Sequence, residues 1–480
     1  MKQKTFLPSF NIKKIILLII LIPFVISAQP KIYTLDDAIG QALRNNKSIT
    51  ISQMDVKKAG ATVNEAFGYA LPRLDLSGNF SHFIKKPLMP FPDFEALLTN
   101  ATYSILFDEG VIPRDDSKYL PMETKLQSFA LTNAYTTDLT LTQTLFSSAV
   151  FEGIGASKIY YNLSQAELDN TVSKTVLDVQ RAFYGVLLSK AVLEIARASF
   201  QNSQDNFNNV VALYNQGMVS EFDKLQAEVQ VENIRPYVLQ LENTLINTKN
   251  RLKILLGEKQ EQDIDVFAEI VYQPIENINE EAFIDEALQN NFDIRSLGLK
   301  KQVDEAFIQL DVAEYWPNLA AFGNYAYSGS SDEWNFQNYS SFTVGLSFQM
   351  NLWQGNRTKN AVQQSTITYE QTAQQELLLQ DAIKADVKEK INELRRVQSL
   401  VEVQRGTVKL AERAYQIANV RYKEGAGSQL EIQDTDIALR NAKLNLTQSV
   451  HSYIITKFEL ERLLGRTSTD YLSVVNKQED

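Results

Sequence analysis

The chain has 480 residues, 44% of them hydrophobic and 22% charged, values that are ordinary for a folded protein. It contains no cysteine, which excludes disulfides and thiolate metal sites, and its two histidines are too few to build a zinc site or a catalytic dyad easily. The net charge of −11 argues against nucleic acid as a partner. We expect no metal, no cofactor and no catalytic residues, because no nucleophile with a base and no phosphate loop is present either.

The N-terminus has the pattern of a secretory signal peptide. Four lysines precede the apolar run IILLIILIPFVISA, which extends from Ile15 to Ala28. A membrane anchor is the alternative, but spanning a bilayer takes about 20 apolar residues and this run is shorter. We therefore predict a cleaved signal over residues 1–28. Its removal takes away four lysines and no acid, so the net charge changes from −11 to −15.

The rest of the chain is a duplicated unit. ALRNNKSI, which begins at Ala42, matches ALQNNFDI, which begins at Ala287, at an offset of 245. Further on the offset falls to 207 and then 208, so the first copy carries about 38 extra residues between its two predicted strands. A period this long is too large for a solenoid repeat. We divide the chain into a first repeat, a second repeat and a C-terminal tail: residues 29–270, 271–468 and 469–480.

Each repeat predicts the order helix, strand, loop, strand, very long helix, corner, long helix. The predicted helices before the corners cover residues 34–70, 149–216, 279–316 and 356–424. Pro72 and Pro317 end the first helix of each repeat, and Pro236 is expected to kink or break the helix after the first corner. The first long helix carries a heptad seam, formed by Val172, Val176, Val179, Phe183 and Val186. A helix of about 65 residues is roughly 100 Å long, which suits a coiled-coil wall or spacer.

The predicted strands alternate in polarity. In FTVGLSFQMNL, from Phe342 to Leu352, every second residue is apolar, and DLTLTQTLF, from Asp138 to Phe146, alternates similarly except at Gln143. Such segments match a tilted transmembrane strand of about 9–11 residues, although a half-buried strand in a soluble sheet is the alternative. Four strands cannot close a barrel, and an open edge cannot sit in lipid, so several chains would have to pool their strands. Two chains give eight strands with a filled interior, whereas three give twelve and a lumen.

Two glycine-centred corners stand 208 residues apart, in YNQGMVSEFDKLQAE and YKEGAGSQLEIQDTD. We expect the first glycine of each corner to end a helix in the left-handed conformation and the serine to cap the next helix. A plain capped hairpin would need no tyrosine at the start of either motif, which favours docking of a partner here. The residues that define the corners are Tyr214, Gly217, Ser220, Tyr422, Gly425 and Ser428.

These features together resemble the TolC-like outer membrane efflux protein family. The resemblance rests on the duplicated LxxALxNN starts (Leu35, Ala38 and Leu43 in the first copy), the two proline turns and the two glycine corners, and it covers about residues 32–466. It implies a mainly α fold with a small β portion, in which a homotrimer pools four transmembrane strands per chain into a shared 12-stranded barrel. Its long coiled-coil helices would form a periplasmic tunnel. The implied location is the outer membrane and the periplasm, with outer-membrane lipid, a periplasmic adaptor protein and an inner-membrane transporter as partners.

The resemblance also implies roles for the corners. They would lie at the periplasmic end of the tunnel, where the adaptor docks and the pore closes. The residues that match the family's pore constriction are Asp223, Tyr422, Glu431 and Asp434. Gly427 stands where the family has a gating arginine, so the same salt-bridge lock is not expected. For the two acids near the second corner, an ordinary solvated helix face is the alternative.

The sequence therefore predicts a passive outer-membrane channel of a tripartite efflux or type I secretion system. A periplasmic coiled-coil adaptor or scaffold is the alternative, which would share the helical hairpins but not the strands. The segment 84–136, rich in proline and aromatic residues, replaces the short loop 328–340 of the second repeat. We expect it to lie outside the cell, as a variable loop or as a cap over the mouth of the barrel.

Overall fold

The computed structural model describes residues 30–269, 272–275, 277–467, 471–472 and 475. The predicted signal peptide and most of the predicted tail lie outside these residues. The described chain is mainly helical and forms two compact units. Unit 1 contains the residues up to Lys57, Asn162–Leu299 and those from Ala373 onward, and unit 2 contains Lys58–Tyr161 and Lys300–Thr372. The units do not coincide with the sequence repeats, because each repeat contributes segments to both.

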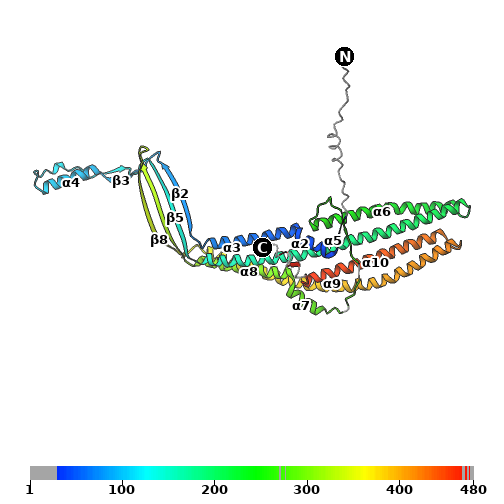
Figure 1. Cartoon of the computed structure of the whole chain (residues 1–480). Helices are drawn as coiled ribbons and strands as arrows, with labels where there is room; N and C mark the ends of the chain where they lie inside the picture. Colours follow the sequence, from blue (N-terminus) through cyan, green and yellow to red (C-terminus); the bar gives the residue numbers. More distant parts are fainter. Residues whose placement is uncertain (1–29, 270–271, 276, 468–470, 473–474, 476–480) are drawn as a thin grey trace, which may run out of the picture. The chain divides into compact units, whose positions relative to one another are not determined.

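Figure 1 shows the elements of both units. The helices are α2 (Leu35–Asn45), α3 (Lys47–Gly68), α4 (Phe94–Asp108), α5 (Ser148–Asn215), α6 (Glu221–Leu256), α7 (Glu280–Asn290), α8 (Phe292–Val312), α9 (Arg357–Lys423) and α10 (Gln429–Leu463), with short 3-10 turns η1 (Asp116–Lys118) and η2 (Ala313–Tyr315). The strands are β1 (Lys31–Tyr33), β2 (Arg73–His82), β3 (Met89–Pro92), β4 (Thr124–Gln127), β5 (Asn133–Ser147), β6 (Ile264–Val266), β7 (Asn318–Ser331) and β8 (Gln337–Gln349). Within the described part of the chain, no helix has the length and apolarity needed to span a membrane.

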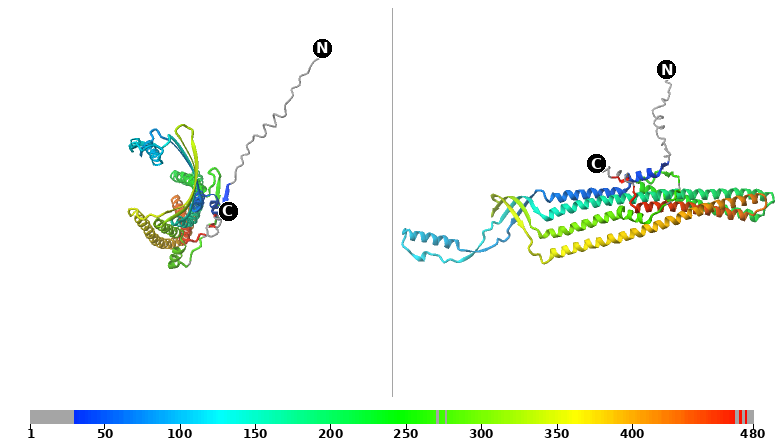
Figure 2. Two further views of the ribbon diagram at one scale, coloured as in Figure 1. Left: turned by 90° about the vertical axis from the view of Figure 1, so that its left-hand side faces the viewer. Right: turned by 90° about the horizontal axis from the view of Figure 1, so that it is seen from below.

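Two long helical hairpins dominate unit 1. Helix α5 turns back as α6, and α9 turns back as α10 (Figures 1 and 2). The predicted bounds of the two very long helices are confirmed to within one residue at each end. All five residues of the predicted heptad seam are buried, and α9 buries an equivalent series: Ile383, Val387, Ile391, Leu394, Val397 and Val401. Helix α6 continues through Pro236, so of the two predicted outcomes the break is wrong and the kink stays a prediction.

The first helix of each repeat is broken once, where an unbroken helix was predicted. Asn46 has extended backbone angles, its side-chain amide donates to the carbonyl of Leu255 at 2.9 Å, and its oxygen accepts from the N–H of Ser48 at 2.8 Å. Asn291 in the second repeat donates in the same way to the carbonyl of Leu463 at 3.0 Å. Each asparagine thus caps the helix that follows and binds the last turn of a distant helix, which explains why the helix breaks there.

A glycine completes each of these junctions. Gly257 and Gly465 follow the ends of α6 and α10 with φ of 65° and 70°. A Cβ atom on Gly257 would lie 2.4 Å from the carbonyl oxygen of Asn45, and one on Gly465 would lie 2.2 Å from that of Asn290. Both the left-handed backbone and the close approach of a second chain segment therefore require glycine at these two positions.

Unit 2 contains one antiparallel sheet in the order β2–β5–β7–β8. Residues paired across the four strands share a face, and one face is apolar over the half of the sheet nearer α3 and α5. Two of its rows are Leu74–Leu141–Gly323–Val344 and Leu76–Leu139–Tyr325–Phe342. The apolar side chains of β8 on this face are 68–72% exposed. The opposite face is polar, and there the amide of Asn324 donates to the hydroxyl of Thr140 at 2.8 Å.

Gln143 is the one polar residue that the pattern placed on the apolar side of β5. Its amide donates to the carbonyls of Ala70 at 2.9 Å and Thr144 at 2.7 Å. The register of β5 against β7 shifts between Thr144 and Phe146, so that Phe146 pairs with Leu319. This bulge brings Phe146 back into the apolar face. The amide of Gln143 therefore supplies hydrogen bonds to two backbone carbonyls next to the bulge in β5.

The segment between β2 and β5 is a folded excursion rather than an open loop. It contains β3, α4, η1 and β4, and β3 pairs with β4. Its base is fastened to the β7–β8 turn by Asp332, which accepts from Lys86 and from the N–H and hydroxyl of Thr132 at 2.9 and 2.7 Å. These bonds lower the pKa of Asp332 from 3.8 to about 2. The bond from Lys86 has the largest effect, and the two bonds from Thr132 come next. The pKa of Asp332 is lower in the folded protein than in the unfolded chain. The stabilisation by its hydrogen bonds is therefore fully present above the ordinary carboxyl pKa and is lost as the pH falls through about 2.

The junction glycines give the first testable prediction. Gly257→Ala and Gly465→Ala should each lower the free energy of unfolding by at least about 2 kcal/mol, since alanine is strained at positive φ and its Cβ overlaps a backbone carbonyl. Gly406→Ala is the matched control, because Gly406 lies within α9 and a Cβ there meets no atom within 4 Å. We expect the control to be neutral or stabilising. Thermal unfolding of the purified protein measures all three, and an equal melting temperature for all would contradict the prediction.

Candidate functional site at the two helical corners

The first corner ends α5 with a fully paired turn. Gly217 has a φ of 72°. Its N–H donates to the carbonyl of Tyr214 at 2.8 Å, and the N–H of Met218 donates to that of Leu213 at 2.9 Å. This pair of bonds is a Schellman motif, which satisfies the last carbonyls of a helix. Ser220 then caps α6, so the predicted helix end and cap are confirmed.

The second corner repeats this geometry after α9. Gly425 has a φ of 73°. Its N–H donates to the carbonyl of Tyr422 at 3.0 Å, and the N–H of Ala426 donates to that of Arg421 at 2.8 Å. Ser428 caps α10. In both corners the glycine and the serine thus have a local role, whereas the carbonyl that accepts from the glycine N–H belongs to the backbone and does not require a tyrosine side chain.

Asp223 has a structural partner at the first corner. Its carboxylate accepts from the N–H and the hydroxyl of Ser220, at 3.1 and 2.6 Å, which completes a capping box. The hydroxyl of Tyr422 is buried and has no hydrogen-bond partner among the described residues. Burial raises the pKa of Tyr422, and the negative charge of Asp223 raises it further. The structure therefore brings these two predicted residues near one another without a hydrogen bond between them.

The guanidinium group at the second corner comes from Arg421, which the sequence analysis did not single out. It donates to the carbonyl of Ala426 at 3.0 Å and pairs with the carboxylate of Glu431 at 3.4 Å. Gly427 packs against the same turn, where a Cβ would lie 3.0 Å from the backbone nitrogen of Tyr422. A side chain at position 427 would therefore push against the backbone of the corner. Arg421, on α9, instead connects the end of its own helix to the turn at Ala426 and to the start of α10 at Glu431.

The two predicted acids of α10 differ in their surroundings. Glu431 is half-buried and engaged by Arg421. Asp434 is exposed, and the described residues offer it no hydrogen bond or ion pair. Of the three carboxylates among the four predicted constriction residues, Asp434 is therefore the one that has no partner among the described residues.

Polar contacts hold the two hairpins together behind the corners. Gln433 of α10 donates to Gln230 of α6 at 2.9 Å and accepts from Gln226 at 3.4 Å. Deeper in, the buried carboxylate of Asp436 accepts from the hydroxyl of Ser199 on α5 at 2.6 Å. Sequence reasoning missed these residues, since partners more than 200 positions apart leave no local pattern.

The corners also expose large apolar side chains. On and just after the first corner these are Met218, Phe222, Leu225 and Val229, and beside the second they are Val420 and Leu430. Phe222 is 72% exposed and Met218 69%. These side chains are left exposed by the described part of a single chain. The spacing of Phe222, Leu225 and Val229 on one helical face could have revealed this surface from the sequence.

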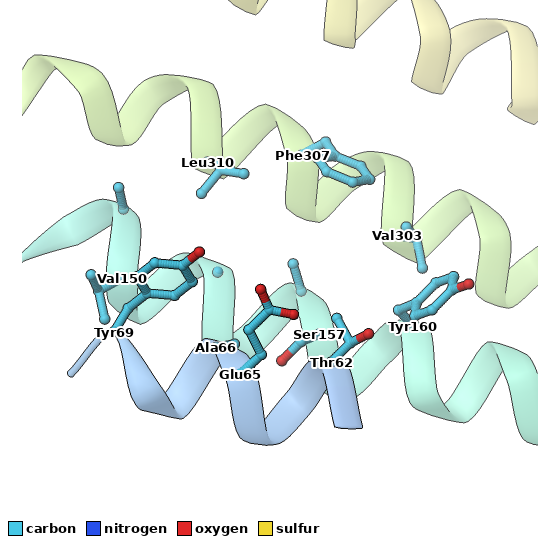
Figure 3. Close-up of a pocket in the computed structure, with 13 residues that line it drawn as sticks. Thr62, Glu65, Ala66, Tyr69, Val150, Ser157, Tyr160, Val303, Phe307 and Leu310 are labelled. Atoms are coloured by element: carbon cyan, nitrogen blue, oxygen red, sulfur yellow. The ribbon is translucent and has the colours of Figure 1, made fainter. Parts of the chain in front are cut away.

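Unit 2 contains a separate apolar cavity of about 560 Å³. Phe307 and Leu310 of α8 face Tyr69 and Glu65 across α5 (Figure 3). Its walls are mostly aliphatic and aromatic, and among the described residues no group of three or more histidine, aspartate or glutamate side chains could hold a metal ion. The cavity is suited to an apolar ligand and contains none of the predicted site residues.

Comparison with known proteins identifies the family. A model of the family described as outer membrane efflux protein matches residues 123–258 and 283–466, which is more than half of the chain. The chain belongs to this family.

Individual relatives agree with the assignment. Outer membrane protein TolC of Vibrio cholerae is 20% identical over 343 residues, covering 70% of this chain and 78% of that protein. TolC of Escherichia coli K12 is 20% identical, with 72% of each chain covered. Among solved structures, the Campylobacter jejuni outer membrane channel CmeC has a TM-score of 0.69 at 14% identity, covering 93% of this chain and 88% of that one. The Vibrio cholerae outer membrane protein VceC has a TM-score of 0.67 at 15% identity, with 90% and 96% covered.

The family and the fold place this protein in the outer membrane, where it serves as an efflux or secretion channel. This confirms the family predicted from the duplicated starts, proline turns and glycine corners. It also decides against the alternative of a periplasmic adaptor or scaffold.

The contacts of Arg421 give the second testable prediction. Arg421→Gln should remove the ion pair with Glu431 and weaken the bond to the carbonyl of Ala426, so that amide exchange at residues 424–428 becomes at least several-fold faster. Arg413→Gln is the matched control, since Arg413 is an exposed arginine of the same helix. Hydrogen exchange followed by mass spectrometry measures both, and unchanged protection in Arg421→Gln would show that the guanidinium does not hold the corner.

Proposed function

We propose that three copies of this chain form a passive exit duct, with a shared 12-stranded barrel in the outer membrane and a helical tunnel in the periplasm. The observation that carries the proposal is the sheet of unit 2, which has one exposed apolar face and two unpaired edges, β2 and β8. Backbone groups at an open edge have no partner in lipid, so β8 of one copy must pair with β2 of the next. Three copies pool twelve strands, enough to leave a lumen, whereas two would leave a filled barrel.

The duplicated chain supports the same assembly. We propose that the segments 29–270 and 271–468 are two repeats of one unit, since each supplies one strand pair, one junction with an asparagine and a glycine, and one corner. A tunnel wall built from three copies then contains six related hairpins. Such a duct needs no catalytic step, because it only provides a path through which cargo diffuses. That path is either already open or opened by a partner protein.

We propose further that the two corners bind a periplasmic adaptor protein, which connects the duct to an inner-membrane transporter. The exposed apolar side chains beside the corners support this, since they are otherwise left in water. The paired turns at Gly217 and Gly425 make both corners rigid, which lowers the entropy lost on binding. The relative AprF of Pseudomonas aeruginosa, 23% identical over 238 residues, is named an alkaline protease secretion protein.

The second corner is the proposed constriction. Three copies around one axis would bring three Asp434 carboxylates into one ring, which attracts cations and repels anions. Glu431 contributes less to this field, because Arg421 already offsets its charge. The buried hydroxyl of Tyr422 and the capping carboxylate of Asp223 would support the corner from behind.

Ion selectivity tests the duct and its constriction. Single-channel recordings of the purified protein in a planar bilayer should show small, cation-selective openings. Asp434→Asn should lower the cation preference more than Glu431→Gln, and the double variant should lower it most. Asp386→Asn, which removes an exposed carboxylate from α9 far along the chain from the corner, is the control and should retain most of the selectivity. Protein that never inserts would overturn the channel, and unchanged selectivity in the double variant would overturn the constriction.

Docking is tested at the corners themselves. Gly217→Val and Gly425→Val should weaken adaptor binding at least about tenfold, since valine at positive φ forces the paired turn to rearrange. Phe222→Ser tests the apolar surface without disturbing the turn. Binding of a purified adaptor to the immobilised channel measures all three. Wild-type affinity in both Phe222→Ser and the glycine variants would contradict docking at this surface.

A further inference from the structure

The excursion between β2 and β5 presents an apolar surface that the duct does not account for. Helix α4 buries only Ala96, and its exposed side includes Phe94, Leu98 and Ile105, which are 46%, 55% and 63% exposed. Together with Ala101 these residues are spaced 4, 3 and 4 apart. We call the four residues the α4 seam. Spacing of this kind is typical of a helix that packs against another helix.

The opposite side of α4 is already occupied by its own excursion. The side chain of Asn100 donates to the carbonyl of Leu120 at 2.8 Å and accepts from its N–H at 2.7 Å. Phe107 meets the ring of Tyr119 edge-on at 5.8 Å. At about 100° per residue, these contacts point away from the α4 seam. The ring of Phe94 stacks on Phe91 of β3 at 6.2 Å between centroids, whereas Leu98, Ala101 and Ile105 are left exposed. The seam is therefore a second face, which the excursion covers only in part and at Phe94.

We propose that the α4 seams of neighbouring copies pack against one another, and so gather the excursions into a helical bundle beyond the end of the strands. This inference rests on the proposed ring of copies. The excursion grows out of β2, the edge strand that has to pair with the next copy, and its base is fixed to the β7–β8 turn by Asp332. Copies joined through their sheets therefore present their α4 helices at the same end of the strands. In each copy the base of the excursion is held in place by Asp332.

The length of the seam favours a copy of this chain over a free partner. Helix α4 has 15 residues, so its seam covers about two heptads. A contact of this length is marginal between free molecules. Between copies that are already joined it is effectively intramolecular, and the effective concentration reaches the millimolar range.

Lipid is the less suitable cover for the seam. Helices that lie on membranes carry lysine and arginine on their polar face. Helix α4 contains neither, and acids stand at both of its ends: Asp93, Glu95, Asp108 and Glu109. The seam ends at Ile105, so that packing of like helices leaves Asp108 and Glu109 beyond the contact. At the other end, Lys125 pairs with Asp93 and offsets its charge.

Cysteine crosslinking tests the seam cleanly, because the chain contains no native cysteine. Leu98→Cys and Ala101→Cys place one thiol on the seam, and Lys118→Cys places one on an exposed residue of the same excursion away from it. Each full-length variant is reconstituted into lipid vesicles and treated with a short bis-maleimide. We expect a covalent dimer from both seam variants, in at least several-fold excess over the Lys118→Cys control.

The other outcomes distinguish failure of the proposed α4 seam contact from failure of the proposed ring of copies. The molar mass of each variant in detergent shows whether the copies associate. Associated copies whose seam thiols react with a water-soluble maleimide yet form no dimer would overturn the seam and leave the duct intact. Seam thiols that are shielded in vesicles without forming a dimer would indicate lipid, and equal dimer from all three variants would indicate non-specific contact. Copies that do not associate would overturn both the ring and the seam.

Discussion

The need to pair every backbone N–H and C=O at the end of an element governs this structure. Long helices leave free carbonyls, and the chain satisfies them with left-handed glycines at the corners and with asparagine side chains at the junctions. The same need explains Gln143, whose amide reaches two carbonyls next to a bulge. At the outer edges of β2 and β8 no strand among the described residues meets this need, which is the physical reason for the proposed assembly of several copies.

Regular periodicity made the larger elements predictable. The heptad seam of α5 and the alternation in β8 identified a buried helix face and an exposed apolar sheet face, and the chain positions of the corners followed from Gly217 and Gly425. The breaks at Asn46 and Asn291 were missed because the apolar pattern continues past them, through Ile49 and Ile294. What decides the break is a carbonyl about 200 or 170 residues away, which no local pattern records.

The candidate site was predictable only in outline. The glycine and serine positions follow from helix ends that are visible in the sequence. Arg421 was not visible, because its partners are a backbone carbonyl and a glutamate brought near by the turn itself. Asp223 was predicted from the family resemblance as a residue of the pore constriction. The hydrogen bonds that its carboxylate makes in the structure are those of a capping box with Ser220.

The two corners share a backbone but present different chemistry. The first is surrounded by exposed apolar side chains such as Met218 and Phe222, while the second is bridged by the ion pair of Arg421 and Glu431. The second corner also exposes Val420 and Leu430, so what distinguishes it is the ion pair, and salt weakens an ion pair more than an apolar contact. The two turns have the same backbone geometry, and their side chains make the two corners chemically distinct.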